Sequence, residues 1–332
     1  MNKRLERLDV GGNLMNNRSI AMQACNQMLQ QLSTAILGKE SEIERLMIAV
    51  LAGGHVLLED VPGTGKTQLV KSLATVLGGQ FRRIQCNPDL LPTDITGVSI
   101  FHPAEQRFVF RSGPVHTNVL LADEINRATT KTQSALLEAM EEGYVTVDGE
   151  GYKLPEPFIL LATQNPIEFE GTYSLPEAQL DRFMMKLSLG YPSAKDEMAM
   201  VQNIDRIHPS DHITPCIEIN ELLLIREYVD AIHLDHSVAS YLMSLIQATR
   251  DHIHLRLGAS PRSSISLAKA ARARAFLHKR EYVIPDDVKE LFLQIIGHRV
   301  LPSMEARMQG VTTEQVLMQL LESTPIPLSV LR

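Results

Sequence analysis

The chain has 332 residues, 44% of them hydrophobic and 21% charged, so it is long enough for about two domains that each bury a core. This composition excludes a disordered, collagen-like or coiled-coil protein. Because 39 aspartates and glutamates outnumber 32 lysines and arginines, the net charge is −7, which disfavours a protein built mainly to coat nucleic acid or an anionic membrane.

Three cysteines, Cys25, Cys86 and Cys216, are odd in number and lie far apart in the sequence. None belongs to a Cys-x-x-Cys pair, which disfavours both a disulfide framework and a zinc site. The first residues lack the apolar segment of a signal peptide, and the apolar runs are far shorter than the ~20 residues of a membrane-spanning helix. We therefore expect a cytoplasmic protein with no integral membrane segment.

Strands alternate with helices along the first part of the chain. Apolar residues at helical spacing predict helices at 20–36 and 40–51, separated by a break at Leu37-Gly38. We expect strands at residues 55–59, 81–85, 118–122, 158–162 and 183–187, and further helices at 66–77, 131–142 and 176–182. This alternation predicts an α/β fold with a mainly parallel sheet.

Two β-hairpins are expected as inserts in this series. The first, at residues 101–117, is indicated by Phe-Val-Phe at 108–110 and Gly-Pro at 113–114, and the second, at 144–154, by Tyr-Val-Thr-Val followed by an Asp-Gly-Glu-Gly turn at 148–151. After about residue 192 the pattern changes to amphipathic helices, at 195–206, 219–231, 237–250, 261–277 and 285–296. The sequence therefore predicts an α/β domain at residues 1–192, of which 1–36 form an N-terminal helical segment, and a helical domain at residues 193–332.

The strongest chemical signal is the loop from Asp60 to Thr67, between a predicted strand and a predicted helix. It fits the P-loop pattern Gly-x₄-Gly-Lys-[Ser/Thr], except that Asp60 stands at the leading glycine. Its glycines let backbone N–H groups approach a phosphate at the start of a helix, Lys66 would pair with the β- and γ-phosphates, and the Thr67 hydroxyl would ligate Mg²⁺. The predicted nucleotide contacts here are Asp60, Val61, Pro62, Gly63, Thr64, Gly65, Lys66, Thr67 and Gln68.

A second signal is the apolar strand that ends in Asp123-Glu124. Ligands of parallel sheets bind at this edge, where the strands end. Asp123 would hold Mg²⁺ directly or through water, and Glu124 would polarise the attacking water. An acidic pair alone could equally cap the next helix, but together with the loop it predicts nucleotide binding.

Four further stretches resemble the MoxR branch of the AAA+ ATPases. They are Leu-Leu-Ala-Asp-Glu-Ile-Asn-Arg-Ala at 120–128, Ala-Thr-Gln-Asn-Pro at 162–166, Leu-Pro-Glu-Ala-Gln-Leu-Asp-Arg-Phe at 175–183 and Gly-Ala-Ser-Pro-Arg at 258–262. With the loop they occur in the family's order over most of the chain, and that family tolerates the aspartate at position 60. The resemblance implies a P-loop AAA+ core with two hairpin inserts, an all-α lid domain, and ATP and Mg²⁺ as cofactors.

The same resemblance assigns roles that the residues alone would not. It implies that Asn165 is the sensor-1 residue that orients water, that Arg182 is an arginine finger for the neighbouring subunit's γ-phosphate, and that Arg262 is sensor 2 in the lid. Leu37 and Gly38 would lie against adenine. Taken singly, Asn165 is a turn residue, the two arginines are surface charges, and Leu37-Gly38 is a helix break.

By resemblance, the expected function is ATP hydrolysis in a ring homo-oligomer, most often a hexamer, that remodels or matures a client protein complex. A von Willebrand factor A-domain protein is a frequent partner in the family. The hairpins would face the ring pore or partners, with Phe108, Phe110 and Tyr144 as grips on a polypeptide, or they could pack inward as structural decoration.

Two alternatives remain open at this point. One is a nucleic-acid motor related to helicase or magnesium-chelatase subunits, although the acidic charge leads us to expect no nucleic-acid partner. The other is an ATP-dependent interaction switch with little turnover, which would need neither Glu124 nor Arg182.

Overall fold

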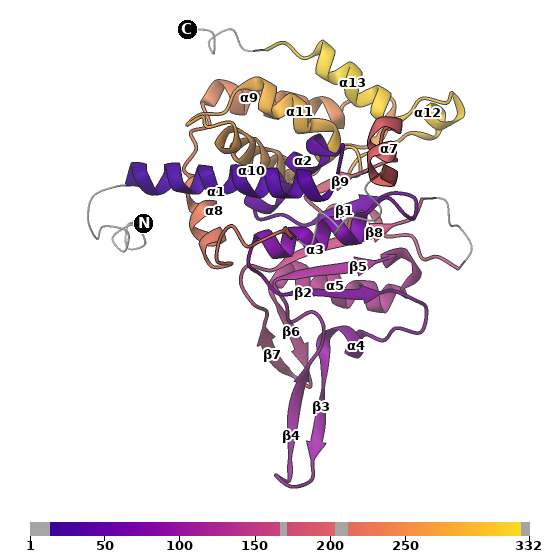
Figure 1. Ribbon diagram of the computed structural model, residues 1–332. Helices are drawn as coiled ribbons and strands as arrows, with labels where there is room; N and C mark the ends of the chain where they lie inside the picture. The colour runs from indigo at the N-terminus through magenta and orange to yellow at the C-terminus, as the bar shows by residue number, and fades with distance from the viewer. Residues whose placement is uncertain (1–13, 167–170, 203–211, 327–332) are drawn as a thin grey trace.

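The computed structural model describes residues 14–166, 171–202 and 212–326. Its centre is a five-stranded sheet in the order β2-β5-β8-β1-β9 (Figure 1), and all four strand pairs are parallel. The strands are β1 (Val56–Glu59), β2 (Phe81–Gln85), β5 (Val119–Asp123), β8 (Ile159–Gln164) and β9 (Met185–Leu187). The predicted α/β fold with a parallel sheet is confirmed.

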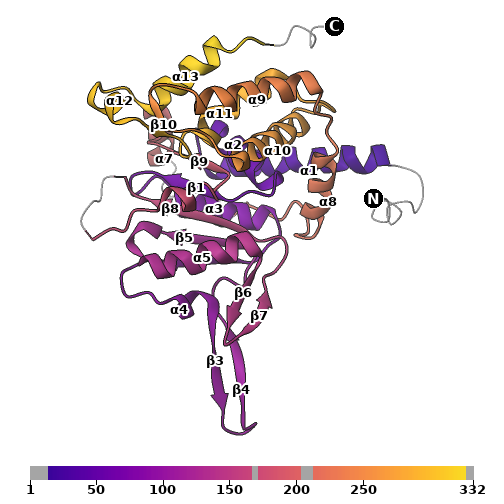
Figure 2. The same ribbon diagram turned by 180° about the vertical axis from the view of Figure 1, so that it is seen from behind.

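Both faces of the sheet are covered, which is why its central strands β5 and β8 are almost continuously apolar, whereas the edge strand β2 is not. In β5, Val119 and Leu121 join the hydrophobic cluster under α1, α2 and α3, whereas Leu120 and Ala122 join the cluster under α5. Figure 2 shows α5 across one face of the sheet, on the opposite side from the N-terminal helices. These helices are α1 (Leu14–Ala35), α2 (Glu40–Leu51), α3 (Lys66–Val76) and α5 (Thr130–Glu142).

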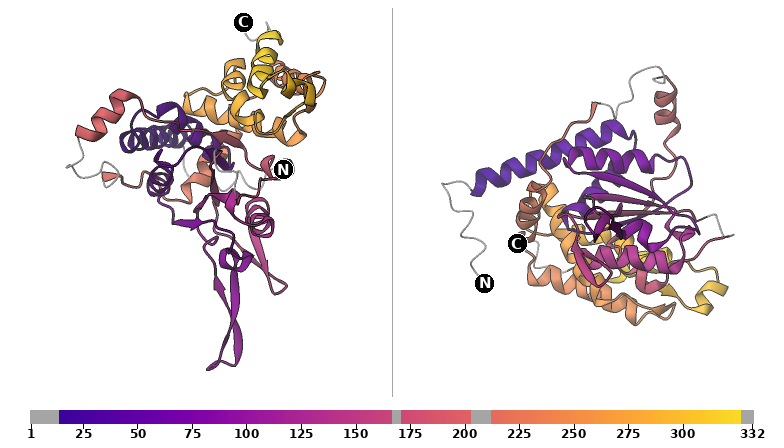
Figure 3. Two further views of the ribbon diagram at one scale, coloured as in Figure 1. Left: turned by 90° about the vertical axis from the view of Figure 1, so that its right-hand side faces the viewer. Right: turned by 90° about the horizontal axis from the view of Figure 1, so that it is seen from below.

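Two antiparallel hairpins leave this core, and the first projects far from the body of the molecule (Figures 1 and 3). It consists of β3 (Gly97–His102) and β4 (Arg107–Ser112), preceded by the short helix α4 (Pro92–Thr96). The predicted range 101–117 was wrong at both ends, because the first strand already starts at Gly97 and the second ends at Ser112. The second hairpin, β6 (Tyr144–Val147) with β7 (Glu150–Lys153), confirms the prediction.

The C-terminal part of the chain is helical and lies at the opposite end of the molecule from the first hairpin (Figure 1). The five helices expected there are present, although residues 203–206 of the first lie outside the described residues. The short helix α12, the 11-residue helix α13 and a two-stranded pairing were not predicted. The elements are α7 (Ala194–Gln202), α8 (Glu221–Asp230), α9 (His236–Arg250), β10 (Leu255–Leu257), α10 (Pro261–Leu277), α11 (Pro285–Ile296), β11 (Leu301–Pro302), α12 (Met304–Met308) and α13 (Thr313–Ser323).

The hydrophobic core is continuous between the sheet and these helices. A single cluster contains Met28 of α1, Leu46 of α2 and Leu267 of α10 together with Val119 and Leu121 of the sheet, so one core joins the sheet to the helical part. The two parts on either side of the predicted domain boundary near residue 192 therefore share one core. The boundary itself stays a prediction. Within the described ranges, none of the helices combines the length and apolarity needed to cross a bilayer.

Candidate nucleotide-binding site

The loop after β1 lines a cavity of about 530 Å³ at the edge where the parallel strands end. Residues from both sequence motifs and the predicted sensor-1 position meet there, although they are about 100 positions apart in the chain. The lining residues are Asp60, Pro62, Gly63, Thr64, Gly65, Lys66, Thr67, Gln68, Arg83, Gln85, Asp123, Glu124, Thr163, Gln164 and Asn165.

The glycines of the loop shape a cradle on this cavity. Gly63 and Gly65 have φ of +84° and +86°, which L side chains rarely adopt, and nothing lies within 4 Å of a Cβ built on either. A side chain at these positions would project into open space that a phosphate can occupy instead. Helix α3 then begins at Lys66 without a side-chain cap, so its first N–H groups are available to an anion.

Lys66 is held by the loop itself. Its ammonium donates to the carbonyl oxygens of Asp60 at 3.0 Å and Val61 at 2.7 Å. Burial lowers the pKa of Lys66, and the carboxylates of Asp60, Asp123 and Glu124 act in the opposite direction. The lysine therefore lies at the cavity with hydrogen bonds that a phosphate could replace.

The side chain of Asp60 binds main-chain N–H groups of the protein itself. Its carboxylate accepts hydrogen bonds from the backbone N–H groups of Leu189 at 2.7 Å, Gly190 at 2.9 Å and Val61 at 3.1 Å. Asp60 is 5% exposed. Its side chain links the loop to the segment after β9, and the residue also lines the cavity.

Asp123 and Glu124 are positioned by neighbours on two adjacent strands. Asp123 accepts from Arg83 at 2.5 Å and from the Thr163 hydroxyl at 2.5 Å. Glu124 accepts from the side-chain amide of Gln85 at 2.8 Å, and its own N–H donates to Thr163 at 2.8 Å. Glu124 also has φ of +55°, a strained conformation that clusters at functional sites.

The oxygen ligands here fit Mg²⁺. A threonine hydroxyl and a carboxylate, from Thr67 and Asp123, are the hard donors that this ion takes together with phosphates and water. Among the described residues there is no group of three or more His, Cys, Asp or Glu side chains that could hold a metal by itself. A magnesium ion at this site would therefore need the nucleotide to complete its ligands.

Arg83, Gln85 and Thr163 were not identified from the sequence. The signal for the first two was the polar alternation Arg-Arg-Ile-Gln in residues 82–85, but only the pairing of β2 with β5 shows that they meet the acidic pair. Sequence order alone does not reveal which strands are neighbours.

The two predicted arginines lie together, outside the cavity. Arg182 binds Glu141 with 2.9 Å between Nε and Oε2, and Arg262 binds the other oxygen of the same carboxylate. Neither arginine is among the residues that line the P-loop cavity. The helix predicted at 176–182 shortens to α6 (Glu177–Leu180), so Arg182 follows it on the turn toward β9.

Comparison with known proteins decides the family. The sequence profile of the "ATPase family associated with various cellular activities (AAA)" matches residues 55–185, and that of the "AAA lid domain" matches residues 247–320. Chaperone MoxR1 of Mycobacterium tuberculosis is 40% identical over 306 residues, which cover 90% of this chain and 81% of that protein. The chain belongs to the MoxR family of AAA+ ATPases. Protein MoxR of Methylorubrum extorquens is 30% identical over 329 residues, covering 90% and 94% of the two chains.

Two further relatives agree with this placement. Uncharacterized protein YeaC of Bacillus subtilis is 46% identical over 299 residues, covering 90% of this chain and 93% of its own. A solved structure of a candidate ATPase from Cytophaga hutchinsonii matches with a TM-score of 0.88 and 36% identity, covering 98% and 99% of the two chains. The MoxR-type core and helical lid are thus shown over nearly the whole chain.

The remaining predicted contact of this MoxR-family chain, Leu37-Gly38, lies apart from the phosphate cradle. Gly38 has φ of +69°, and a Cβ there would collide with the carboxylate of Asp196 in α7. The break between α1 and α2 therefore packs directly against the first lid helix. Contact of Leu37 and Gly38 with adenine stays a proposal.

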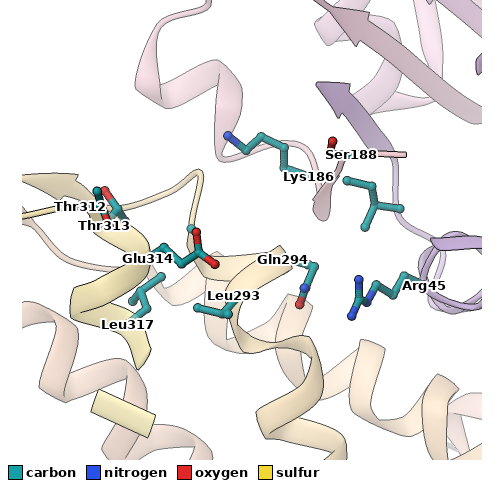
Figure 4. A pocket seen from close by; sticks show the side chains of 11 residues that line it. Arg45, Lys186, Ser188, Leu293, Gln294, Thr312, Thr313, Glu314 and Leu317 are labelled. Carbon is teal, nitrogen blue, oxygen red and sulfur yellow. The ribbon is translucent and has the colours of Figure 1, made fainter. Parts of the chain in front are cut away.

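A second cavity of about 480 Å³ lies where the lid meets the sheet edge. Figure 4 shows Lys186 and Ser188 of the core facing Leu293, Gln294 and the start of α13 across this space. None of the predicted site residues lines it. It belongs to the joint between core and lid rather than to the phosphate site.

Proposed function

We propose that this chain binds and hydrolyses ATP in the P-loop cavity. The observation that carries the proposal is the convergence of Lys66, Thr67, Asp123, Glu124 and Asn165 on one cavity. A cradle of backbone N–H groups, a P-loop lysine and an acidic pair form the set that binding a nucleoside triphosphate with Mg²⁺ requires.

In this proposal each residue has one task. Lys66 leaves the loop carbonyls and binds the β- and γ-phosphate oxygens, while Thr67 and Asp123 hold Mg²⁺, which would neutralise charge on the phosphates. Glu124 orients the attacking water and takes up its proton, and Asn165, at the end of β8, fixes that water from the other side. For this, Glu124 must exchange its hydrogen bond to Gln85 for one to water.

We further propose that the site is completed by a neighbouring subunit. Arg182 binds Glu141 and does not line the cavity of its own chain, which supports a role as arginine finger for a nucleotide held by another copy of the chain. Arg262, which shares Glu141, is proposed as the sensor-2 residue of the lid. Arginine supplied in this way requires a head-to-tail contact, and such contacts close into rings. A homohexamer in the cytoplasm is the form we propose.

The output we propose is chaperone-like remodelling of a client protein complex, together with a von Willebrand factor A-domain partner. Its support is the first hairpin, where Phe101 and Phe108 form an edge-to-face pair at 5.4 Å and are 45% and 69% exposed. Tyr144 on the second hairpin is also exposed. Phe110 is not available as a grip, because it is partly buried and stacks on Tyr152 at 3.7 Å.

One observation favours a second candidate, an ATP-dependent interaction switch. Asp123 is paired with Arg83 and Glu124 with Gln85, an arrangement in which both carboxylates are occupied. A site held in this way would bind ATP and turn over slowly until a partner releases it.

Binding and hydrolysis of ATP measured on three variants test the proposal. Lys66→Ala should lose binding of a fluorescent ATP analogue, whereas Glu124→Gln should keep binding and lose phosphate release by roughly 10²–10⁴-fold. Lys71→Ala, an exposed lysine on the same helix, is the matched control and should behave as wild type. If Lys66→Ala binds ATP as well as Lys71→Ala, the proposal is wrong.

A further inference from the structure

The segment that carries Arg182 is fastened to the lid on both sides of that residue. Before it, the Asp181 carboxylate accepts from the Ser260 hydroxyl at 3.0 Å and lies 3.5 Å from Nη1 of Arg299. After it, the carbonyl oxygen of Phe183 accepts from Nη2 of Arg299 at 2.7 Å and from Nε2 of His298 at 3.0 Å. The lid thus contacts the residues immediately before and after Arg182.

Arg299 makes most of these contacts and is itself enclosed. Its side chain is 1% exposed, and it also donates to the carbonyl of Met184 at 3.3 Å and to the Ser266 hydroxyl at 3.2 Å. Burial lowers the pKa of Arg299 to about 10, so the guanidinium is still charged at neutral pH. A buried charge is costly unless its partners are fixed, and here three of the partners belong to the core segment of Asp181, Phe183 and Met184.

The contact between core and lid is tightly packed at Arg299, but a cavity lies next to it. The cavity of about 480 Å³ between core and lid is lined by Leu293, Gln294 and Gly297, which precede Arg299, and by Lys186 and Ser188, which follow the segment that it holds (Figure 4). The lid therefore has space to shift at the sheet edge, and the core segment bound to Arg299 would move with it.

We propose that Arg299 is a positioning residue that couples the lid to Arg182. By holding the main chain before and after Arg182, it makes the arginine follow the lid, so that a lid movement changes how Arg182 is presented to the neighbouring subunit. This inference rests on the proposed function, because it assumes that Arg182 acts on a nucleotide bound by another copy.

Mixing variant subunits of the full-length chain and measuring their ATPase rate distinguishes two claims. One is that Arg182 acts on a neighbouring subunit's nucleotide, and the other is that Arg299 positions Arg182. Arg299→Gln should lower the maximal ATPase rate by at least ~10-fold, toward the ~10²-fold that a displacement of about 1 Å can cost, while the affinity for a fluorescent ATP analogue stays within about 2-fold. Arg182→Ala should lower the rate at least as much. Adding Lys66→Ala subunits, which cannot bind ATP but carry an intact Arg182, should restore activity to both variants.

The matched control is Arg274→Gln. Arg274 binds the buried Asp287 at 2.7 Å within the lid, and Arg280 still binds that carboxylate in the variant, so the rate should stay near that of wild type. Adding Arg299→Gln to Arg182→Ala should cause no further loss, because no guanidinium remains to be positioned. If Arg299→Gln does not fold, Arg299→Lys and Ser260→Ala are measured in the same way, and smaller losses with the same rescue are expected.

The outcomes point to different conclusions. Rescue of both Arg182→Ala and Arg299→Gln by Lys66→Ala subunits supports the inference. Rescue of Arg182→Ala alone, or an unchanged rate in Arg299→Gln, overturns the inference and leaves the shared site standing. If neither variant is rescued, the shared site itself is wrong.

Discussion

Replacing Asp60 by alanine should destabilise the protein more than it weakens ATP binding. The side chain accepts three backbone hydrogen bonds, and two of them reach across the structure to Leu189 and Gly190. A hydrogen bond to a charged group contributes about 1.5–3 kcal/mol. Because Gly190 can rebind water after the substitution, we expect a total loss of about 3–5 kcal/mol in the free energy of unfolding.

Thermal unfolding with and without ATP analogue measures both effects. At about 2–4 °C per kcal/mol for a domain of this size, Asp60→Ala should lower the melting temperature by about 6–20 °C, and nucleotide should still raise it. Asp94→Ala is the control, since Asp94 is exposed and accepts one backbone bond, from Leu91 at 2.9 Å. A melting temperature equal to that of Asp94→Ala, combined with loss of nucleotide binding, would refute the anchoring role and favour direct contact with the nucleotide.

Three further predictions concern acid stability, the resting state and the first hairpin. Burial lowers the pKa of His55 to about 4 and of His298 to about 3, whereas the unfolded chain protonates both below about pH 6.5. The free energy of unfolding should therefore be highest above pH 6.5 and fall as the pH is lowered, by up to about 2 kcal/mol for each histidine at pH 5. A melting temperature that is the same at pH 7.5 and pH 5 would contradict this. Gln85→Ala should remove one partner of the Glu124 carboxylate, with Arg127 still at 3.3 Å, and raise basal phosphate release by roughly 3- to 10-fold; an unchanged rate would show that the hydrogen bond from Gln85 does not restrain Glu124. Phe108→Ser should leave the melting temperature within about 1–2 °C but reduce binding of a permanently unfolded polypeptide, and undiminished binding would exclude this phenylalanine as a grip.

The sequence predicts the parts of the site that are local in the chain. Gly63, Gly65 and Lys66 act through a strand, a tight loop and a helix that follow one another, so the pattern of residues is also the pattern in space. Asp123 and Glu124 could be placed at the same edge because parallel strands end together.

Contacts between strands and between domains could not be predicted in this way. Arg83 meets Asp123 only because β2 is the neighbour of β5. Glu141 looks like one acidic residue among several on α5, and its link to Arg182 and Arg262 depends on how the lid packs. The position of Asp60 in the loop pattern suggested that it contacts the nucleotide, whereas its side chain binds the segment after β9.

The first hairpin is present, but its predicted bounds were wrong for a different reason. The aromatic residues around Phe108 marked the second strand, but the first strand is mostly exposed, with no buried residue after Gly97, and carries a weaker signal. Such a projecting hairpin has little core to impose a pattern, so its ends are poorly defined by the sequence.

The central claim is that a neighbouring subunit completes the ATPase site. The most direct test is the steady-state ATPase rate per subunit against protein concentration, for wild type and Arg182→Ala, with Glu124→Gln as the background. Our account predicts a rate that rises with concentration in wild type and stays near background in Arg182→Ala. A rate per subunit that is constant from the lowest concentrations and unaffected by Arg182→Ala would contradict it.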